Sequence, residues 1–420
     1  MSDNKKDIRL SQISEWLTNN YLIHGRLRCN AISGRIQVAT DLDNSVWIDV
    51  VDREFNSMVI DCSEDLERNI SPAEFQTVLD SKRIPLVNPI HDYIQSLAPY
   101  SENEPDWITR KANEITLLHP EQRERFIACF TKWIVAMVAC WMDDNVANHQ
   151  VLVLVGPQGI FKTSWLFKLL PEPLRMYQNN LVLNGMGKVD DDVRNMLYEN
   201  AIVNLDELDA MGTSEINQIK SLITCQVITN RGKYQRFKSS HMRIASLCGS
   251  TNKTHFLTDL TGSRRWMPFE VSAIVNPYEN IFPLDRMYAQ AYHLYRNGLE
   301  YWMTPEDNAV LNQHNEDFRV QDSMEELLHL WFDQPASNCG TFMTSAEIGE
   351  FLINQGSIKR PMSSQALSIL LKKAGFQPTR KKINGNQIRG FLVYKRERDE
   401  VDRIKRDIVT SAHPSDIPTD

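Results

Sequence analysis

The stretch Val151–Leu170, VLVLVGPQGIFKTSWLFKLL, constrains the fold more than any other part of the chain. Its first five residues are apolar and mostly β-branched, which predicts a strand that is buried on both faces. A turn with two glycines follows, and the run after it has the pattern of a helix that ends before Pro171. A strand, a glycine turn and a helix that begins with Lys-Thr predict a phosphate-binding loop and, with it, an α/β core.

Each position of this loop has an expected role. Gly156 and Gly159 let backbone N–H groups approach an anion, and the helix N-terminus adds partial positive charge. Lys162 is expected to contact the β- and γ-phosphates of ATP, and the Thr163 hydroxyl to bind Mg²⁺. Phe161 departs from the pattern G-x-x-x-x-G-K-[ST], because it stands where the second glycine belongs. The alternative is a strand, turn and helix that contain Lys-Thr by chance.

A second strand is expected at Ala201–Leu205, and two carboxylates follow it directly. In an ATPase, Asp206 would hold the Mg²⁺ ion and Glu207 would polarise the attacking water. The same pattern also fits a surface turn. The position of these carboxylates in the sequence, after the predicted phosphate-binding loop, favours the catalytic interpretation.

A third strand is expected at Arg243–Leu247, and Asn252 lies just beyond it. A side-chain amide at this place can contact both the γ-phosphate and water. Arg264 and Arg265 follow in a turn, where a guanidinium can stabilise the transferring phosphoryl group from a neighbouring subunit. The alternative is that the two arginines are ordinary surface residues without a catalytic role.

Between the second and third strands lies a turn signal followed by basic residues that alternate with aromatic ones. Lys233, Arg236 and Lys238 are the basic residues expected to contact single-stranded DNA, with neighbouring aromatic rings available for base stacking. A solvated basic hairpin is the alternative, and the sequence leaves both open.

Five motifs in this order, GPQGIFKT, NLDELDAM, the basic segment, SLCGSTN and LTGSRRW, resemble the virulence-associated protein E family. That family is related to the superfamily 3 helicases of the AAA+ class, and the resemblance covers Ile108–Val271. It implies a P-loop ATPase that forms a homo-oligomer, a hexameric ring, and acts on DNA in the replication of a phage or mobile element. Members of the family also lack the second glycine. The resemblance assigns these roles: Lys162 and Thr163 to the Walker A motif, Asp206 and Glu207 to Walker B, Asn252 to the sensor, Arg264 and Arg265 to the finger, and Lys233–Lys238 to the DNA-tracking hairpin.

The C-terminal part has the pattern of a winged helix. Thr344 and Glu347 form a capping box for one helix, and Ser364 can cap a second helix that ends at Gly375. Two strand-like runs then flank Asn384-Gly385, a strong hairpin signal. The basic residues of this hairpin would contact phosphates of duplex DNA, although a protein-docking wing is the alternative. The residues expected to do so are Lys381, Lys382 and Arg389.

Net charge is unevenly distributed. The chain carries −8, but Ser357–Arg398 contains eleven Lys and Arg and one acid, so the remaining residues carry −18. Contact with nucleic acid should therefore be local. Seven cysteines without a C-x-x-C pair predict reduced thiols in a cytoplasmic protein, and no export signal is recognised at the N-terminus. The apolar run Trp133–Met142 is half the length that spans a bilayer, which predicts a buried helix and no membrane contact.

Four parts are expected. Residues 1–105 form a small α+β domain, with a first helix, a hairpin at Arg26–Thr40, a strand at Ser45–Val51 and no catalytic centre. The other parts are the P-loop core with a preceding helical segment (106–300), a helical connector with the winged helix (301–398) and a disordered tail (399–420). Tyr100–Asp106 is interpreted as a linker, and Ile108–Leu118 and Glu121–Met142 as helices.

The leading hypothesis is an ATP- and Mg²⁺-dependent DNA helicase or DNA-remodelling ATPase. The alternative is a slow nucleotide-binding switch that recruits replication proteins, which Phe161 favours. A small-molecule kinase also uses a P-loop, but it needs neither the basic aromatic segment nor the winged helix.

Overall fold

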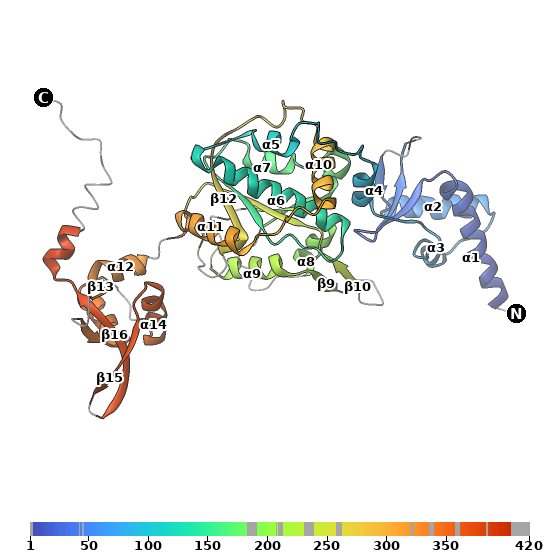
Figure 1. The fold of residues 1–420 in the computed structure, drawn as a ribbon. Coiled ribbons are helices and arrows are strands. Elements are labelled where there is room, and N and C mark those ends of the chain that lie inside the picture. The colour runs from blue at the N-terminus through green and yellow to red at the C-terminus, as the bar shows by residue number, and fades with distance from the viewer. Residues whose placement is uncertain are drawn as a thin grey trace. The chain divides into compact units, whose positions relative to one another are not determined.

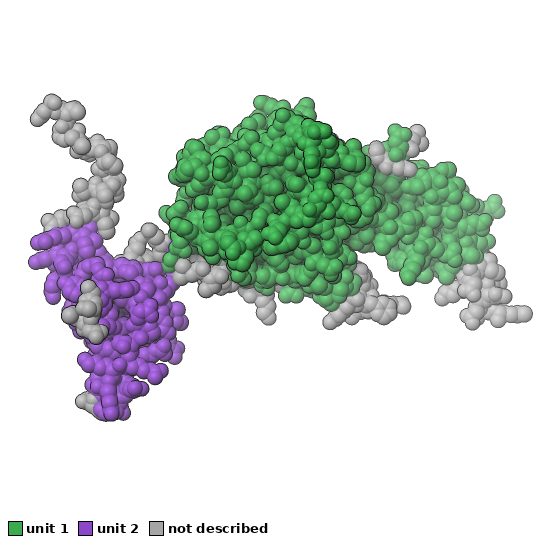
Figure 2. Space-filling view, in the orientation of Figure 1, with its two compact units in different colours: residues 1–319 green, residues 320–420 purple. Residues whose placement is uncertain are grey.

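The computed structural model describes residues 3–41, 43, 46–182, 191–206, 208, 213–230, 239–257, 263–320, 323–335, 340–357, 362–383 and 385–404. Two units make up the chain, residues 1–319 and residues 320–420 (Figure 2). Each unit combines helices with β-sheet, so the predicted α/β class is confirmed. The six cysteines in the described residues are free thiols.

A six-stranded sheet forms the centre of the first unit, in the order β5-β12-β6-β11-β8-β7. All neighbouring strands are parallel except β5, which pairs antiparallel with β12. The predicted strands after Gln150 and after Asn200 are present, whereas the third begins three residues later than expected. The bounds are β5 Ile115–Leu117, β6 Val151–Val155, β7 Gln178–Leu181, β8 Ile202–Leu205, β11 Ser246–Thr251 and β12 Trp266–Ile274.

Helices cover both faces of this sheet (Figure 1). Leu152 and Leu154 of β6 belong to the core formed with α6 (Arg123–Met142), α7 (Lys162–Phe167) and α10 (Leu284–Arg296). Val151, Val153 and Val155 belong to the opposite core, with α8 (Asp191–Glu199) and α9 (Thr213–Thr224). Because successive side chains of a strand point to opposite faces, burial on both faces requires the unbroken apolar run of β6.

The helix α6 is the longest buried element of the first unit. With the 3₁₀ turn that precedes it, α6 forms Pro120–Met142, the one helix in the described part of the chain that is long and apolar enough to cross a membrane. Twelve of its residues are buried in the protein, among them Phe126, Phe130 and Trp133. It packs against α10 and β12 (for example Phe126 on Phe269), so the predicted buried helix is confirmed.

The N-terminal part of the first unit has its own small core. The predicted first helix is α1 (Asp3–Leu17), which buries Ile13, Trp16 and Leu17. The hairpin predicted at Arg26–Thr40 and the strand predicted at Ser45–Val51 are also present, in a sheet of order β3-β2-β1-β4. The elements are β1 Leu27–Asn30, β2 Ile36–Ala39, β3 Trp47–Asp49, α2 Asp52–Asp65, α3 Pro72–Leu79, β4 Leu86–Val87 and α4 Pro89–Ser96.

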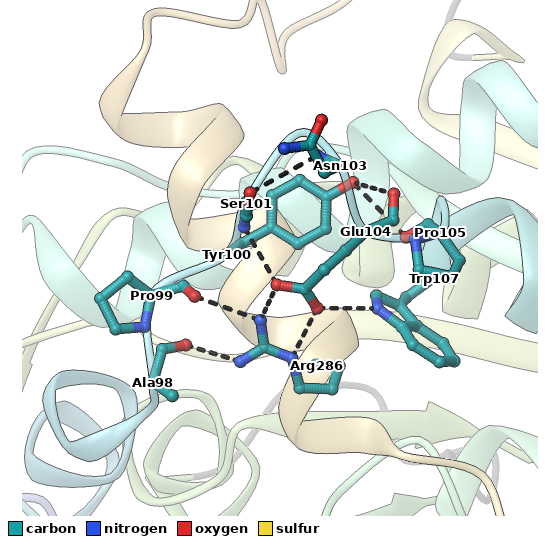
Figure 3. A network of polar contacts seen from close by, with 9 residues as sticks. All are labelled: Ala98, Pro99, Tyr100, Ser101, Asn103, Glu104, Pro105, Trp107 and Arg286. Atoms are coloured by element: carbon teal, nitrogen blue, oxygen red, sulfur yellow. Dashed lines mark hydrogen bonds and ion pairs between the residues drawn. The ribbon is translucent and has the colours of Figure 1, made fainter.

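Tyr100–Asp106, expected as a linker, is tied to α10 by a network of polar contacts (Figure 3). Arg286 donates from Nε to Glu104 Oε2 (2.8 Å) and from Nη2 to Glu104 Oε1. Its Nη1 donates to the carbonyl of Ala98 (2.7 Å), and Trp107 Nε1 donates to Glu104 Oε2 (3.3 Å). The segment expected as a linker is therefore packed against α10, because one arginine satisfies both its Glu104 carboxylate and the main-chain carbonyls of Ala98 and Pro99 just before it.

A buried arginine joins three segments at the start of the central sheet. Arg243 is 1% exposed, and its hydrogen bonds within the described residues all go to main-chain carbonyls. These belong to Ala245 (3.0 Å), Asn148 (2.7 Å), and Leu222 (3.2 Å) and Ile223 at the end of α9. Burial lowers the pKa of Arg243 to about 10, so the guanidinium is charged at neutral pH.

In the second unit, two consecutive helices precede a long hairpin. The capping box of Thr344 and Glu347 begins α13 (Ser345–Asn354), as predicted. Ser363 rather than Ser364 caps α14 (Ser364–Lys373), since its hydroxyl accepts from the N–H of Ala366 (3.2 Å). The remaining elements are α12 Ser323–Trp331, β13 Phe332–Asp333, β14 Thr341–Met343, β15 Pro378–Ile383 and β16 Asn386–Lys395.

Two further expectations need correction. Ile108–Leu118 is not one helix, because α5 (Trp107–Ala112) ends before strand β5. Leu118 also pairs with β12 through its backbone N–H, which donates to the Glu270 carbonyl (2.9 Å). The tail predicted from residue 399 begins with helix, and Val401 is fully buried among the apolar residues of the second unit. Residues 405–420 lie outside the described part.

Candidate functional site

A cavity of about 590 Å³ lies at the carboxyl ends of β6, β8 and β11. In parallel sheets this edge is where ligands bind, because loops of several strands meet there. The segment between β6 and α7, residues 156–161, forms one wall and is called the glycine loop below. The lining residues are Gln158, Gly159, Phe161, Lys162, Thr163, Ser164, Asp206, Ser250, Thr251 and Asn252.

Lys162, the first residue of α7, is held at the centre of this site. Its ammonium donates to the carbonyls of Gly156 (2.7 Å) and Pro157 (2.6 Å) and to Asn252 Oδ1 (3.0 Å). The side chain is largely buried, and burial lowers the pKa of Lys162. An ammonium bound only by neutral oxygens retains a full positive charge that an anion in the cavity can approach.

The glycine loop has two positions where the backbone explains the glycine. A Cβ atom on Gly156 would lie 2.3 Å from the carbonyl oxygen of Val271 in β12, so no side chain fits there. Gly159 has a φ of +88°, in the region that L-residues rarely adopt. The loop therefore approaches its neighbouring strand closely and turns sharply before α7.

Phe161 keeps the backbone conformation expected of the missing second glycine. Its φ and ψ are 66° and 21°, in the left-handed region, at the residue before α7. This conformation costs an L-residue about 1–2 kcal/mol. The ring lies 6.3 Å from that of Tyr278 and is 38% exposed. Phe161 therefore differs from the motif in its side chain but has the backbone conformation that glycine would favour at this position.

Oxygen atoms from α7, from β11 and from the end of β8 line the cavity beside Lys162. The hydroxyls of Thr163 and Ser250 lie 2.8 Å apart, and Asp206 follows β8 on the same side. Hydroxyl and carboxylate oxygens are ligands that Mg²⁺ accepts while it keeps several waters. Ser250 was not assigned a role from the sequence, although it stands in the polar run before Asn252. Glu207, the predicted water-activating residue, lies outside the described residues.

Arg264 and Arg265, the arginine pair, lie at the opposite edge of the sheet. They occupy a 3₁₀ turn (Ser263–Arg265) just before β12, whose first residue Trp266 is in register with Val151 at the start of β6. There they line a second cavity, of about 330 Å³, with residues 148–150. Within one chain, the length of β6 therefore separates the arginine pair from Lys162, by four residues or about 13 Å of strand.

A buried ionic network supports α7 from behind. Lys111 Nζ lies 2.6 Å from Glu114 Oε2, which also accepts from the indole N–H of Trp165 on α7 (2.7 Å). Glu114 Oε1 accepts from the side chain of Asn280 (2.7 Å). Burial lowers the pKa of Lys111, while the adjacent carboxylate opposes that shift. Sequence reasoning missed this network because its members are dispersed over 170 residues without a motif.

The predicted DNA-contacting residues fall into two groups. Lys233, Arg236 and Lys238 lie outside the described residues, between β9 (Val227–Asn230) and β10 (Ser239–Met242), which pair antiparallel.

On the second unit, the hairpin β15–β16 exposes the other three residues. Arg389 is directly opposite Arg380, and Lys382 shares their face because side chains alternate along a strand. Lys381 points to the other face, with its ammonium 5.9 Å from the Phe342 ring.

Comparisons with known proteins give one family. The sequence model described as the virulence-associated protein E-like domain matches residues 106–320, about half of the chain. No curated protein matches the sequence. Among solved structures, an A-form apo structure of the NrS-1 C-terminal region covers 92% of this chain and 99% of its own, at 11% identity and a TM-score of 0.46. A second apo structure of that region covers 90% of this chain and 99% of its own, at 12% identity and a TM-score of 0.46.

Proposed function

The chain belongs to the virulence-associated protein E-like family, and on that premise we propose that it is an ATP- and Mg²⁺-dependent DNA helicase or DNA-remodelling ATPase. It would act as an oligomeric ring in the replication of a phage or mobile element. The observation that carries this proposal is one cavity lined by Lys162, Thr163, Asp206 and Asn252. Each comes from a motif that the sequence had already singled out for the same reaction.

The chemistry of the cavity suits a nucleoside triphosphate. Lys162 and the backbone of the glycine loop would bind the phosphates. Thr163 and Asp206 would hold Mg²⁺, which neutralises charge on the phosphates when it is bound. Asn252, already within hydrogen-bond distance of Lys162, would contact the γ-phosphate. Glu207 would take the proton of the attacking water as ADP leaves.

Two basic elements support action on DNA. The sequence between β9 and β10 contains Lys233, Arg236 and Lys238, which would contact single-stranded DNA in the ring. In the second unit a helix and two short strands precede two helices and a hairpin, an order that supports a winged helix. Its exposed hairpin would contact phosphates of duplex DNA through Lys382 and Arg389.

The alternative function, a slow nucleotide-binding switch, rests on the missing glycine at position 161. The left-handed backbone of Phe161 favours the ATPase instead, because the glycine loop has the local conformation that glycine would provide. The two functions differ in turnover, not in nucleotide binding.

Two variants test the proposal. Lys162→Ala should lose ATP binding with an unchanged fold, because its ammonium faces the cavity. Glu207→Gln should bind ATP but not hydrolyse it. Lys82→Ala, which removes an exposed lysine of the N-terminal part, is the matched control and should behave as wild type. Hydrolysis by Glu207→Gln at the wild-type rate would show that the assigned water-activating role is wrong, and slow wild-type turnover that DNA does not stimulate would favour the switch.

A further inference from the structure

One face of α7 and the loop after β12 bring together two exposed aromatic rings, and one of them, Phe161, lines the main cavity. Phe161, Ser164 and Lys168 are spaced three and four residues apart, so they share a helix face. Tyr278 contacts all three. Its ring lies 6.3 Å from that of Phe161, its hydroxyl donates to Ser164 Oγ (3.2 Å), and the Lys168 ammonium lies 5.2 Å from its ring centroid.

These rings are accessible although they are large and apolar. Tyr278 is 66% exposed and Phe161 38% exposed. Phe161 and Ser164 also line the cavity that contains Lys162, so the aromatic face is continuous with it. Along α7, residue 168 lies about 9 Å beyond residue 162, at a rise of 1.5 Å per residue. The site thus has a polar end with cations and hydroxyls, and an aromatic border that begins at Phe161 and continues through Tyr278 towards Lys168.

We propose that Tyr278 is the platform on which the base of the bound nucleotide stacks, with the Phe161 ring beside it at an interplanar angle of 69°. This inference rests on the proposed function, since it assigns the base of the same nucleotide whose phosphates Lys162 would bind. Aromatic rings stack on any nucleobase, because each base has a π-face. The hydrogen bond to Ser164 and the contact with Lys168 hold the Tyr278 ring in place before the nucleotide arrives, which lowers the entropy cost of binding.

Calorimetric titration with two ligands, MgATP and magnesium tripolyphosphate, separates base from phosphate binding. Tyr278→Ala should weaken ATP binding by about 5- to 150-fold, the usual effect of removing a stacked ring. It should leave the affinity for tripolyphosphate unchanged, because that ligand has no base. Tyr278→Phe keeps the ring and should bind ATP nearly as wild type does. Tyr394→Ala, which removes an exposed tyrosine of the second unit, is the control.

The possible results distinguish this inference from the proposed function. Unchanged ATP affinity in Tyr278→Ala, while Lys162→Ala weakens binding of both ligands, would overturn the stacking platform and leave the ATP site standing. If Tyr278→Ala weakens the binding of both ligands equally, the stacking platform is also wrong, because the ring would then have a purely structural role. A wild-type protein that binds neither ligand would overturn the proposed function and the platform together.

Discussion

The left-handed backbone of Phe161 makes a quantitative prediction about stability. An L-residue at this φ costs about 1–2 kcal/mol relative to an unstrained position, and glycine avoids that cost. Against this, glycine lowers stability by roughly 0.5–1 kcal/mol relative to alanine, through the entropy of the unfolded chain. Phe161→Gly should therefore be more stable than Phe161→Ala by about 0.5–1 kcal/mol, the reverse of the usual order.

The ring contact with Tyr278 cancels from this comparison, because both variants lose it. It contributes about 0.5–1.5 kcal/mol beyond the apolar burial of the ring, so Phe161→Ala should be destabilised by at least that amount relative to wild type. Phe161→Gly should lie between Phe161→Ala and wild type, since relief of strain offsets only part of the losses.

Urea unfolding of the nucleotide-free protein, followed by tryptophan fluorescence, measures these differences as shifts in midpoint at a common slope. Ser164 provides the matched pair, because it lies within α7 and both of its variants lose the hydroxyl that accepts from Tyr278. There the ordinary order should hold, with Ser164→Ala more stable than Ser164→Gly by about 1 kcal/mol. If Phe161→Ala proves at least as stable as Phe161→Gly, the strain at this position is not real.

Three other predictions concern the ring, the wing and the core. In mixed oligomers, Lys162→Ala subunits combined with subunits that lack the arginine pair should recover ATPase activity. The reason is that each site would draw its arginines from a neighbouring subunit, so an intact P-loop can meet an intact arginine pair. Loss of an arginine finger lowers the rate by about 10³–10⁵, so the recovery should be measurable. Co-purifying subunits without recovered activity would place the arginines in cis. Replacing Lys382 and Arg389 should reduce the slope of log K against log salt on duplex DNA by about 1.8, and replacing Lys381 on the other face should change it less; an unchanged slope would assign the wing to protein contacts. Arg243→Met should destabilise the first unit by about 3–5 kcal/mol, since buried carbonyls lose a charged donor, and Arg243→Lys should not restore it because an ammonium lacks the guanidinium fork. Unchanged thermal stability in Arg243→Met would contradict that account.

Local patterns were sufficient to predict most elements of the central sheet. The strand β6, the glycine loop and α7 form one uninterrupted signal, and the strand before Asp206 is equally apolar. Their positions along the chain also predicted that Lys162, Asp206 and Asn252 would meet, because parallel strands place their carboxyl ends at one edge. Periodicity likewise predicted α1 and α6, and the capping box of Thr344 and Glu347 predicted α13.

Features that depend on contacts between distant segments could not be predicted. Arg286 lies about 180 residues from Glu104, so YSENEPD has the composition of a linker although it is packed against α10. The strand β5 exists because it pairs with β12, and the sequence at Ile115–Leu117 fits a helix equally well. Similarly, the pattern could not reveal that Phe161 takes a left-handed backbone, because that conformation is imposed by the path of the glycine loop.

The rate of ATP hydrolysis with and without single-stranded DNA tests the central claim most directly. The wild-type protein should hydrolyse ATP in the presence of Mg²⁺ and do so faster when DNA is added. Lys162→Ala should be inactive under both conditions, with an unchanged circular dichroism spectrum. ATP hydrolysis by Lys162→Ala at the wild-type rate would contradict the account, because the cavity at the carboxyl ends of β6, β8 and β11 would then not be the site of the reaction.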